Sequence, residues 1–473
     1  MTALRSQDFP KNAKAAIADP KLQAALLNIR TIFRDNRARV VAATPEFQEL
    51  RDAGAAIKRE SVANLDVYLQ RFDAAATAQG AEVHFCADAK SARETIAAIC
   101  LAENAKLITK GKSMITEEIG LNPYLMSKGF TPVETDLGEY IIQLRDEPPS
   151  HIIAPACHVK KEQVAETFRA AHTDRPADRD LSTHDSLLAE ARAELRARFL
   201  AADVGISGAN MLVEETGHAV LVTNEGNGDL TQTLPRCHII VASIEKIVPT
   251  LDDAATVLRL LGRSATGQQS SSYTTLSVGT RREGEIDGPQ ACHVVILDNH
   301  RSEMLGGDYE DMLRCIRCGA CINHCPIFAN VGGHAFGTTY VGPMGSVLTP
   351  LLKGLEEAHY LPHACTMCGR CADVCPMEIP LPDLLRKLRN QTHAQDLTSA
   401  TSRHGLALWT FLAERPKLMR AASRVGGAMM RLVGRRGALR HWPMAGEWTR
   451  FRDLPVPQGG GFVGRANATK TKD

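Results

Sequence analysis

The 473-residue sequence has no stretch that approaches eighteen consecutive apolar residues, the length that a membrane-spanning helix needs. Residues 1–12 also lack the apolar core of an export signal. Both absences predict a cytoplasmic protein without transmembrane segments. No Gly-x-Gly-x-x-Gly loop follows an expected strand, so the sequence carries no dinucleotide-binding fingerprint.

The sequence has little net charge, +1 overall, but that charge is unevenly distributed. Residues 401–473 hold fourteen lysines and arginines against four acidic residues. A basic tail can bind anionic lipid, an acidic partner or nucleic acid, or it can simply be the solvated surface of helices. Nucleic acid is disfavoured because the tail lacks interleaved aromatic side chains that would stack on bases. Peripheral contact with a membrane surface stays open.

Cysteine, in contrast, is abundant, with thirteen residues, and eight of them fall in two short runs, 315–326 and 365–376. Each run reads Cys-x2-Cys-x2-Cys-x3-Cys-Pro, and the second copy lies fifty positions after the first. This is the ferredoxin spacing for [4Fe–4S] clusters, in which the fourth cysteine of a run binds the cluster of the other run. The first cluster is therefore expected on Cys315, Cys318, Cys321 and Cys375, and the second on Cys365, Cys368, Cys371 and Cys325.

Two other uses of these cysteines are less compatible with the pattern. Zinc sites take four ligands, commonly as two separated pairs, and not a four-cysteine run repeated with prolines. Disulfides suit small secreted domains, which this chain does not resemble. The five remaining cysteines are scattered through apolar stretches and are expected to be buried hydrophobic residues: Cys86, Cys100, Cys157, Cys237 and Cys292.

The sequence predicts four successive regions. Residues 1–80 show helical periodicity and are expected to pack on the region that follows. Residues 81–300 alternate short apolar strands with helices, which is typical of a parallel α/β sheet covered on both faces. Residues 301–395 predict a helical two-cluster domain of the ferredoxin type, and residues 396–473 a basic helical region with a disordered glycine-rich end.

Several elements of the α/β region can be located. Residues 151–154 and 238–242 read as fully buried strands, and residues 210–234 as a hairpin. A helix is expected from Ser91, which would be its N-cap, to Ala102. In the tail, the only three tryptophans of the chain predict packing against the ferredoxin domain or against a partner subunit; they are Trp409, Trp442 and Trp448.

Polar loops at expected strand ends are the candidate ligand sites of the α/β region, because open α/β sheets bind ligands there. The Lys-Gly-Lys-Ser loop at 110–113 could hold an anion, although Lys106 stands where a nucleotide-binding P-loop needs glycine. A catalytic carboxylate would be Glu225 or Glu139, beside Lys110 or Lys112. Acid-rich turns are also common as plain solvated helix caps.

Taken together, these motifs resemble the lactate-utilisation protein B family, the iron–sulfur subunit of the bacterial L-lactate utilisation system. The resemblance covers most of the chain. It rests on both cysteine runs and on these segments: Lys-Gly-Lys-Ser at 110–113, Glu-Thr-Asp-Leu-Gly-Glu at 134–139, Ala-Thr-Gly-Gln at 265–268, Ile-Leu-Asp-Asn at 296–299, Gly-Gly-His-Ala at 332–335, Gly-Pro at 342–343 and Arg-Asp-Leu-Pro at 452–455. The chain departs from the family after Pro457, where a glycine run replaces an aromatic ending.

The resemblance implies an α/β LUD domain of the sugar-phosphate isomerase and CoA-transferase type, followed by the cluster domain. It also implies a cytoplasmic complex that oxidises L-lactate to pyruvate. This chain would carry electrons beside a subunit with cysteine-rich repeats and a subunit made of a lone LUD domain. Two alternatives remain: the iron–sulfur subunit of another 2-hydroxy-acid dehydrogenase, and a LUD-domain transferase or isomerase whose clusters sense redox state.

Overall fold

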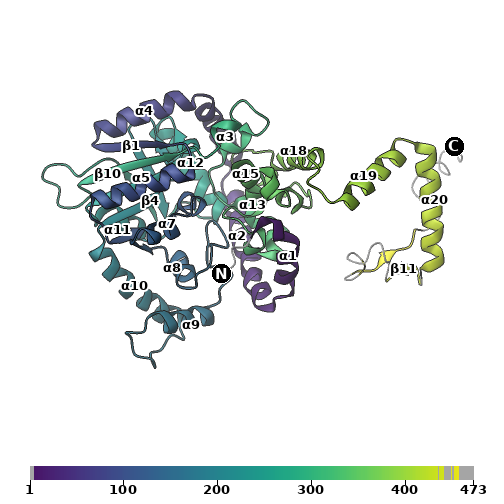
Figure 1. Ribbon diagram of the computed structural model, residues 1–473, viewed down its shortest axis with the longest axis horizontal. Helices are drawn as coiled ribbons and strands as arrows, with labels where there is room; N and C mark the ends of the chain where they lie inside the picture. The colour runs from purple at the N-terminus through teal and green to yellow at the C-terminus, as the bar shows by residue number, and fades with distance from the viewer. Residues whose placement is uncertain (1–4, 435, 441–448, 450–451, 458–473) are drawn as a thin grey trace. The chain divides into compact units, whose positions relative to one another are not determined.

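The computed structural model describes residues 5–434, 436–440, 449 and 452–457, with the backbone alone at 28–30 (Figure 1). The chain divides into two compact units, Met1–Thr392 and His393–Asp473. The first unit contains the α/β region and all thirteen cysteines, and it is organised around one parallel sheet.

The sheet has six strands, all parallel, and its order differs from the order of the chain. From one edge to the other the strands are β1 (Ala81–Cys86), β10 (Ala291–Leu297), β7 (Cys237–Ser243), β4 (Val204–Gly208), β2 (Leu107–Lys110) and β3 (Thr131–Glu134). Every residue of β7 is buried, as expected for a strand covered on both faces. The predicted parallel α/β sheet is confirmed.

Helices cover the two faces of this sheet, and alternate residues of β10 pack into the two cores on its opposite faces. Val295 packs into the core that includes α5 (Ala89–Ala102), whereas Val294 and Ile296 pack into the core that includes α4 (Leu65–Ala78). The remaining helices of the α/β region are α6 (Met114–Glu118), α7 (Leu121–Ser127), α8 (Leu137–Leu144), α9 (Lys161–Ala171), α10 (His184–Ala201), α11 (Asn227–Thr233) and α12 (Leu251–Ala265).

The N-cap of α5 is Asp88, so the prediction of Ser91 is wrong by three residues. The Asp88 carboxylate accepts a hydrogen bond of 2.7 Å from the Ser91 backbone N–H, and the Ser91 hydroxyl accepts one of 3.2 Å from the Asp88 backbone N–H. Ser91 thus completes a capping box from inside the helix.

The predicted hairpin is confirmed. Strands β5 (Met211–Val213) and β6 (His218–Thr223) pair antiparallel. They belong to a second, four-stranded sheet of order β8-β5-β6-β9, which β8 (Ile247–Val248) and β9 (Tyr273–Ser277) complete.

The strand predicted at 151–154 is wrong, because these residues form bends. The Nδ1 atom of His151 accepts hydrogen bonds from the backbone N–H groups of Ile153 (3.0 Å) and Ala154 (3.2 Å), which holds the chain in a tight turn. Burial lowers the pKa of His151 to about 4, so the ring is neutral and Nδ1 can accept. A short apolar run is therefore buried here without joining the sheet.

Residues 1–80 are helical as predicted, and α2 (Pro20–Ala42), α3 (Phe47–Ala63) and α4 contact the α/β region as expected. Helix α3 lies against α12, and α4 lies against β1. Helix α1 (Phe9–Ala18) lies against the cysteine-bearing region, where the Phe9 and Phe336 ring centroids are 5.3 Å apart, and α2 lies against both that region and α12. The N-terminal helices thus support both regions.

The cysteine-bearing region contains only helices and loops between residues 301 and 395, all of which are described. Its two longest helices are α15 (Gly342–Lys353) and α18 (Leu381–Ala394), and a 3-10 turn at Glu310–Arg314 precedes the first cysteine run. Short helices complete the region: α13 (Ala320–Asn323), α14 (Phe328–Val331), α16 (Leu355–Ala358) and α17 (Arg370–Asp373).

The described residues of the second unit form α19 (Ala400–Ala413), α20 (Pro416–Val433) and a pair of two-residue strands, β11 (Ala438–Leu439) and β12 (Leu454–Pro455). Trp409 is exposed on α19; Trp442, Trp448 and the glycine-rich end lie outside the described residues. Within the described part of the chain, every helix is too short or too polar to span a bilayer.

Candidate metal centres

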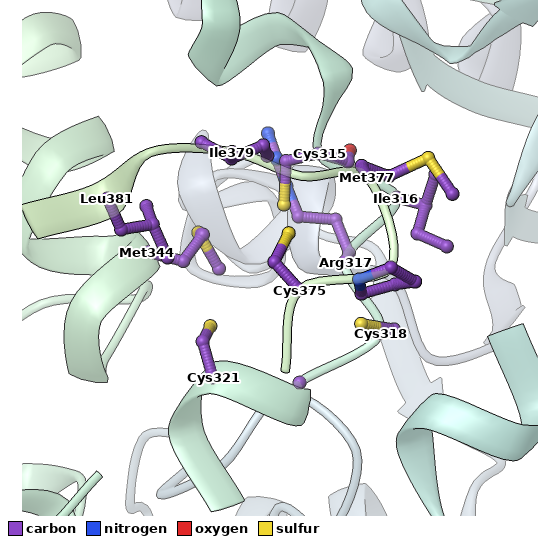
Figure 2. A pocket seen from close by; sticks show the side chains of 12 residues that line it. Cys315, Ile316, Arg317, Cys318, Cys321, Met344, Cys375, Met377, Ile379 and Leu381 are labelled. Atoms are coloured by element: carbon purple, nitrogen blue, oxygen red, sulfur yellow. Dashed lines mark hydrogen bonds between the residues drawn. The ribbon is translucent and has the colours of Figure 1, made fainter. Parts of the chain in front are cut away.

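Four cysteines from two distant segments line one small pocket, which Figure 2 shows with their sulfur atoms pointing toward a common centre. Three come from the first run and the fourth is the last cysteine of the second run: Cys315, Cys318, Cys321 and Cys375. Apolar side chains surround the sulfurs, including Ile316, Met344 and Met377. The structure therefore brings together the four residues that the ferredoxin rule groups.

A second pocket shows the reciprocal arrangement. Its sulfurs come from the first three cysteines of the second run and the last cysteine of the first: Cys365, Cys368, Cys371 and Cys325. Pro326, Ile327, Pro343 and Pro382 contribute to its walls. Each cysteine run thus supplies three sulfurs to one pocket and one sulfur to the other.

The backbone has the same conformation in both runs. The residue before the second cysteine is left-handed in each, with φ of 58° at Arg317 and 56° at Met367. The residue after the second cysteine is also left-handed, with φ of 74° at Gly319 and 81° at Gly369, where only glycine is free of strain. A four-residue helix follows in each case, α13 or α17. This repeated turn directs three sulfurs of a run to one side.

Burial disfavours the thiolate form of five of these eight cysteines in the absence of metal. Burial, with a smaller effect of neighbouring thiols in the same direction, raises the pKa of Cys325 to about 11 and that of Cys371 to about 12. The pKa values of Cys318, Cys321 and Cys375 are also raised, again chiefly by burial. Metal ligands must be thiolates, so cluster binding has to displace these protons. The four cysteines that gather in each pocket fit a [4Fe–4S] cluster.

A buried network of charges joins the first pocket to the α/β region. Arg317 lies between two cysteines of the first run, and its Nη2 atom donates to Glu245 Oε1 at 2.8 Å. Glu245 Oε2 is 3.0 Å from Arg301 Nε, and Arg301 in turn donates to Glu118 at 2.6 Å. Although burial raises the pKa of Glu245, Arg301 and Arg317 hold it at about 2.

Sequence reasoning missed this network because its members are far apart in the chain. Tyr340 is also part of it: its hydroxyl donates to Glu118 at 2.6 Å, and its ring lies 5.3 Å from the Arg317 guanidinium. The position of Arg317 inside the cysteine run is the only sequence signal that could have pointed to it.

Cationic side chains also bind the backbone around both pockets. Arg51 donates to the carbonyl oxygen of Cys375 at 3.0 Å, and Arg37 to that of Val374 at 3.2 Å. Arg389 donates to the carbonyl oxygen of Cys365 at 2.6 Å. Positive charge near a cluster favours its reduced, more negative form, so these residues are levers on the reduction potentials.

A larger cavity, of about 300 Å³, lies at the carboxyl ends of β2, β4 and β7. Two of the four candidate residues from the α/β region line it, Lys112 and Glu225. Lys112 donates to the carbonyl oxygen of Ile153, and Glu225 is exposed at the rim. The cavity also extends to Arg317 and Cys318 of the first cysteine run.

The other two candidates, Lys110 and Glu139, lie apart from the cavity in a buried cluster of charges. Lys110 Nζ is 2.7 Å from Glu134 Oε1 and 3.1 Å from Glu117 Oε1. Burial lowers the pKa of Lys110, but these carboxylates outweigh it and raise the pKa above its usual value. Lys110 is thus a buried structural cation and is not available to a ligand.

Glu139→Gln is expected to leave the protein folded, with a melting temperature within about 2 °C of the wild type. Burial and the carboxylates of Glu134 and Glu117 raise the pKa of Glu139 well above its usual value, so the fold disfavours its charged form and an uncharged amide should be tolerated there. Lys110→Met should be destabilising by about 3–5 kcal/mol, because it leaves buried carboxylates without their cation. Thermal unfolding of both variants measures these stabilities. A loss of stability in Glu139→Gln as large as that in Lys110→Met would show that the fold needs the charge of Glu139.

Comparison with known proteins gives two domain matches. The LUD domain family matches residues 69–297, and the 4Fe-4S dicluster domain family matches residues 311–379, which include all eight clustered cysteines. The chain therefore carries two [4Fe–4S] clusters.

Curated relatives match nearly the whole chain. An uncharacterized electron transport protein of Escherichia coli (strain K12) is 37% identical and covers 96% of this chain and 95% of its own. Lactate utilization protein B of Anoxybacillus flavithermus is 38% identical, with 96% of each chain covered. Lactate utilization protein B of Bacillus subtilis is 37% identical, with 98% of each covered. Identity at this level over the full length shows that the chain belongs to the lactate utilization protein B family.

Proposed function

We propose that this protein is the iron–sulfur electron-transfer subunit of a system that oxidises L-lactate to pyruvate. The observation that carries the proposal is the pair of four-cysteine pockets in a chain whose full-length relatives are lactate utilization proteins. Oxidation of lactate to pyruvate releases two electrons and two protons. Each [4Fe–4S] cluster accepts one electron, so the two clusters hold the pair or pass the electrons on singly.

We assign the ligands of each cluster by the pocket that they line. The first cluster is bound by Cys315, Cys318, Cys321 and Cys375, and the second by Cys365, Cys368, Cys371 and Cys325. The distribution of the sulfurs between the two pockets supports this crossed scheme.

The domain division into residues 1–80, 81–300, 301–395 and 396–473 stays a proposal. The LUD match at 69–297 and the dicluster match at 311–379 support the two central domains. The boundary between the compact units after Thr392 supports a separate C-terminal region.

The chain is proposed to act in the cytoplasm, as a non-catalytic or co-catalytic subunit. Its sister subunits would be one with cysteine-rich repeats and one made of a lone LUD domain. The second unit supports contact with a partner, because its helices expose Trp409, Phe411, Val425 and Met429 among basic side chains. Large exposed apolar side chains of this kind are typical of interaction surfaces.

Two anaerobic measurements test the proposed function. The purified chain should contain about eight irons and eight sulfides, the content of two cubanes. L-lactate should bleach the visible absorbance of the clusters only when the co-purifying partners are present. Lactate oxidation by the isolated chain would contradict the carrier role, and so would clusters that stay oxidised in the active complex.

A further inference from the structure

A cavity of about 300 Å³ lies beside the first cysteine pocket. We propose that it binds a small organic anion in contact with the first cluster's loop, so that anion binding and reduction of that cluster are coupled. The coupling, though not the binding itself, rests on the proposed function, because it requires a [4Fe–4S] cluster in the first pocket.

The position of the cavity in the fold is that of a ligand site. Chain connections run from β2 outward to β3, and from β4 in the opposite direction to β7 and β10. The order therefore reverses between β2 and β4, and ligands of open α/β sheets bind outside the carboxyl ends of the strands at such a point. The loops after these two strands, at 111–115 and 208–210, line the cavity.

The charged and polar groups that face the cavity indicate an anion. Lys246 is buried, and no hydrogen bond or ion pair engages its ammonium group among the described residues. Lys112 is a second cation on the wall. Two carboxylates also lie on the wall. The carboxylate of Asp136 caps α8 and accepts a hydrogen bond from the backbone N–H of Glu139, and the side chain of Glu225 is at the exposed rim. The buried part of the cavity is therefore positive.

A second, independent observation also points to a ligand. Asn227 lines the cavity and is only 7% exposed, yet its side-chain oxygen has no hydrogen-bond partner. Leaving a buried polar atom unpaired costs about 1–3 kcal/mol. A ligand that carries a hydroxyl group would pair with the Asn227 side-chain amide while its anionic group meets the lysines.

The cavity shares a wall with the first cluster pocket. Arg317 and Cys318 line both, so a molecule in the cavity lies directly behind a cluster ligand. A negative charge in the cavity opposes the addition of an electron to the neighbouring cluster. Because coupling between two sites is reciprocal, reduction of the cluster must weaken anion binding by the same factor.

The anionic group can belong to a carboxylate or to a phosphate monoester. Hydroxyl-bearing examples are L-lactate, the substrate of the proposed system, and flavin mononucleotide, whose ribityl chain carries hydroxyl groups. The cavity volume is at the lower end of the range of about 300–1,000 Å³ that is usual for ligand pockets. The experiment therefore includes both compounds, with pyruvate and inorganic phosphate beside them.

The test is an anaerobic potentiometric titration of the full chain, followed by electron paramagnetic resonance, without additions and with each of the four compounds. We expect at least one compound to lower the midpoint potential of one cluster and to leave the other unchanged. A tenfold weaker affinity of the reduced form corresponds to a shift of about 59 mV for a one-electron couple. Calorimetric titration of the oxidised and dithionite-reduced protein should give the same ratio of Kd values.

Variants locate the effect. Lys246→Gln and Lys112→Gln should each weaken binding at least tenfold at full iron content, whereas Lys90→Gln, on a surface lysine of α5 outside the cavity, should change nothing. Three results would overturn the proposal: no compound binds, a compound binds without shifting any midpoint potential, or the midpoint potentials of both clusters shift equally. A chain that lacks one cluster before any addition would instead contradict the proposed function.

Discussion

Cys375→Ser is expected to abolish one cluster and to leave the other, so that iron falls from about eight to about four atoms per chain. A serine hydroxyl is a poor ligand for iron, and no fifth cysteine lines the first pocket to replace the lost thiolate. The loss should also destabilise the surrounding helices, since metal binding contributes to folding free energy. Iron and sulfide analysis with electron paramagnetic resonance of the reduced protein measures the outcome.

Double variants distinguish the crossed scheme from one in which each run holds its own cluster. Under the crossed scheme, Cys375→Ser with Cys315→Ser removes two ligands of the same cluster and still leaves about four irons. Cys375→Ser with Cys371→Ser removes one ligand from each cluster and should leave almost none. The uncrossed scheme predicts the opposite pair of results. Cys100→Ser, at a buried cysteine outside both pockets, is the matched control and should keep all the iron.

The sequence predicts the cluster pockets well because their information is local. The spacing of the cysteines, with glycine after the second of each run, determines which sulfurs a tight turn can present together. The parallel sheet is predicted for a similar reason, since apolar segments such as residues 238–242 are long enough to identify a strand. Only the groupings of Cys375 with the first run and of Cys325 with the second need a family rule, and the pocket geometry agrees with that rule.

Contacts between distant segments account for what the sequence did not predict. Residues 151–154 are as apolar as a strand. They form a turn instead, because His151 Nε2 is hydrogen-bonded to Asn323 Oδ1 at 3.0 Å and His151 Nδ1 accepts from the backbone N–H of Ile153. The candidates Lys110 and Lys112 are two residues apart, yet one is buried among carboxylates and the other lines the cavity. Periodicity carries no information about such partners, because they come from elsewhere in the chain.

Glu245→Ala is expected to lower the free energy of unfolding by about 3–5 kcal/mol, because it leaves two buried arginines without their shared carboxylate. Arg301 is fully buried, and Arg317 is held in the first cysteine run in a left-handed conformation. The first cluster should therefore be lost at lower urea concentration than in the wild type. Anaerobic urea titration, followed by circular dichroism and by the visible absorbance of the clusters, measures both effects.

Two further variants separate the charge of Glu245 from its hydrogen bonds. The side chain of Glu245→Gln can still accept a hydrogen bond from Arg317 but provides no negative charge. Its free energy of unfolding should therefore lie between that of the wild type and that of Glu245→Ala. Glu303→Ala removes a carboxylate that is 70% exposed and paired with His300, and should cost at most about 1 kcal/mol. Equal stabilities of Glu245→Ala and Glu303→Ala would show that the arginines find other partners. The cysteine loop would then be held to the α/β region by apolar packing, and Arg317 would act on the first cluster mainly through its charge.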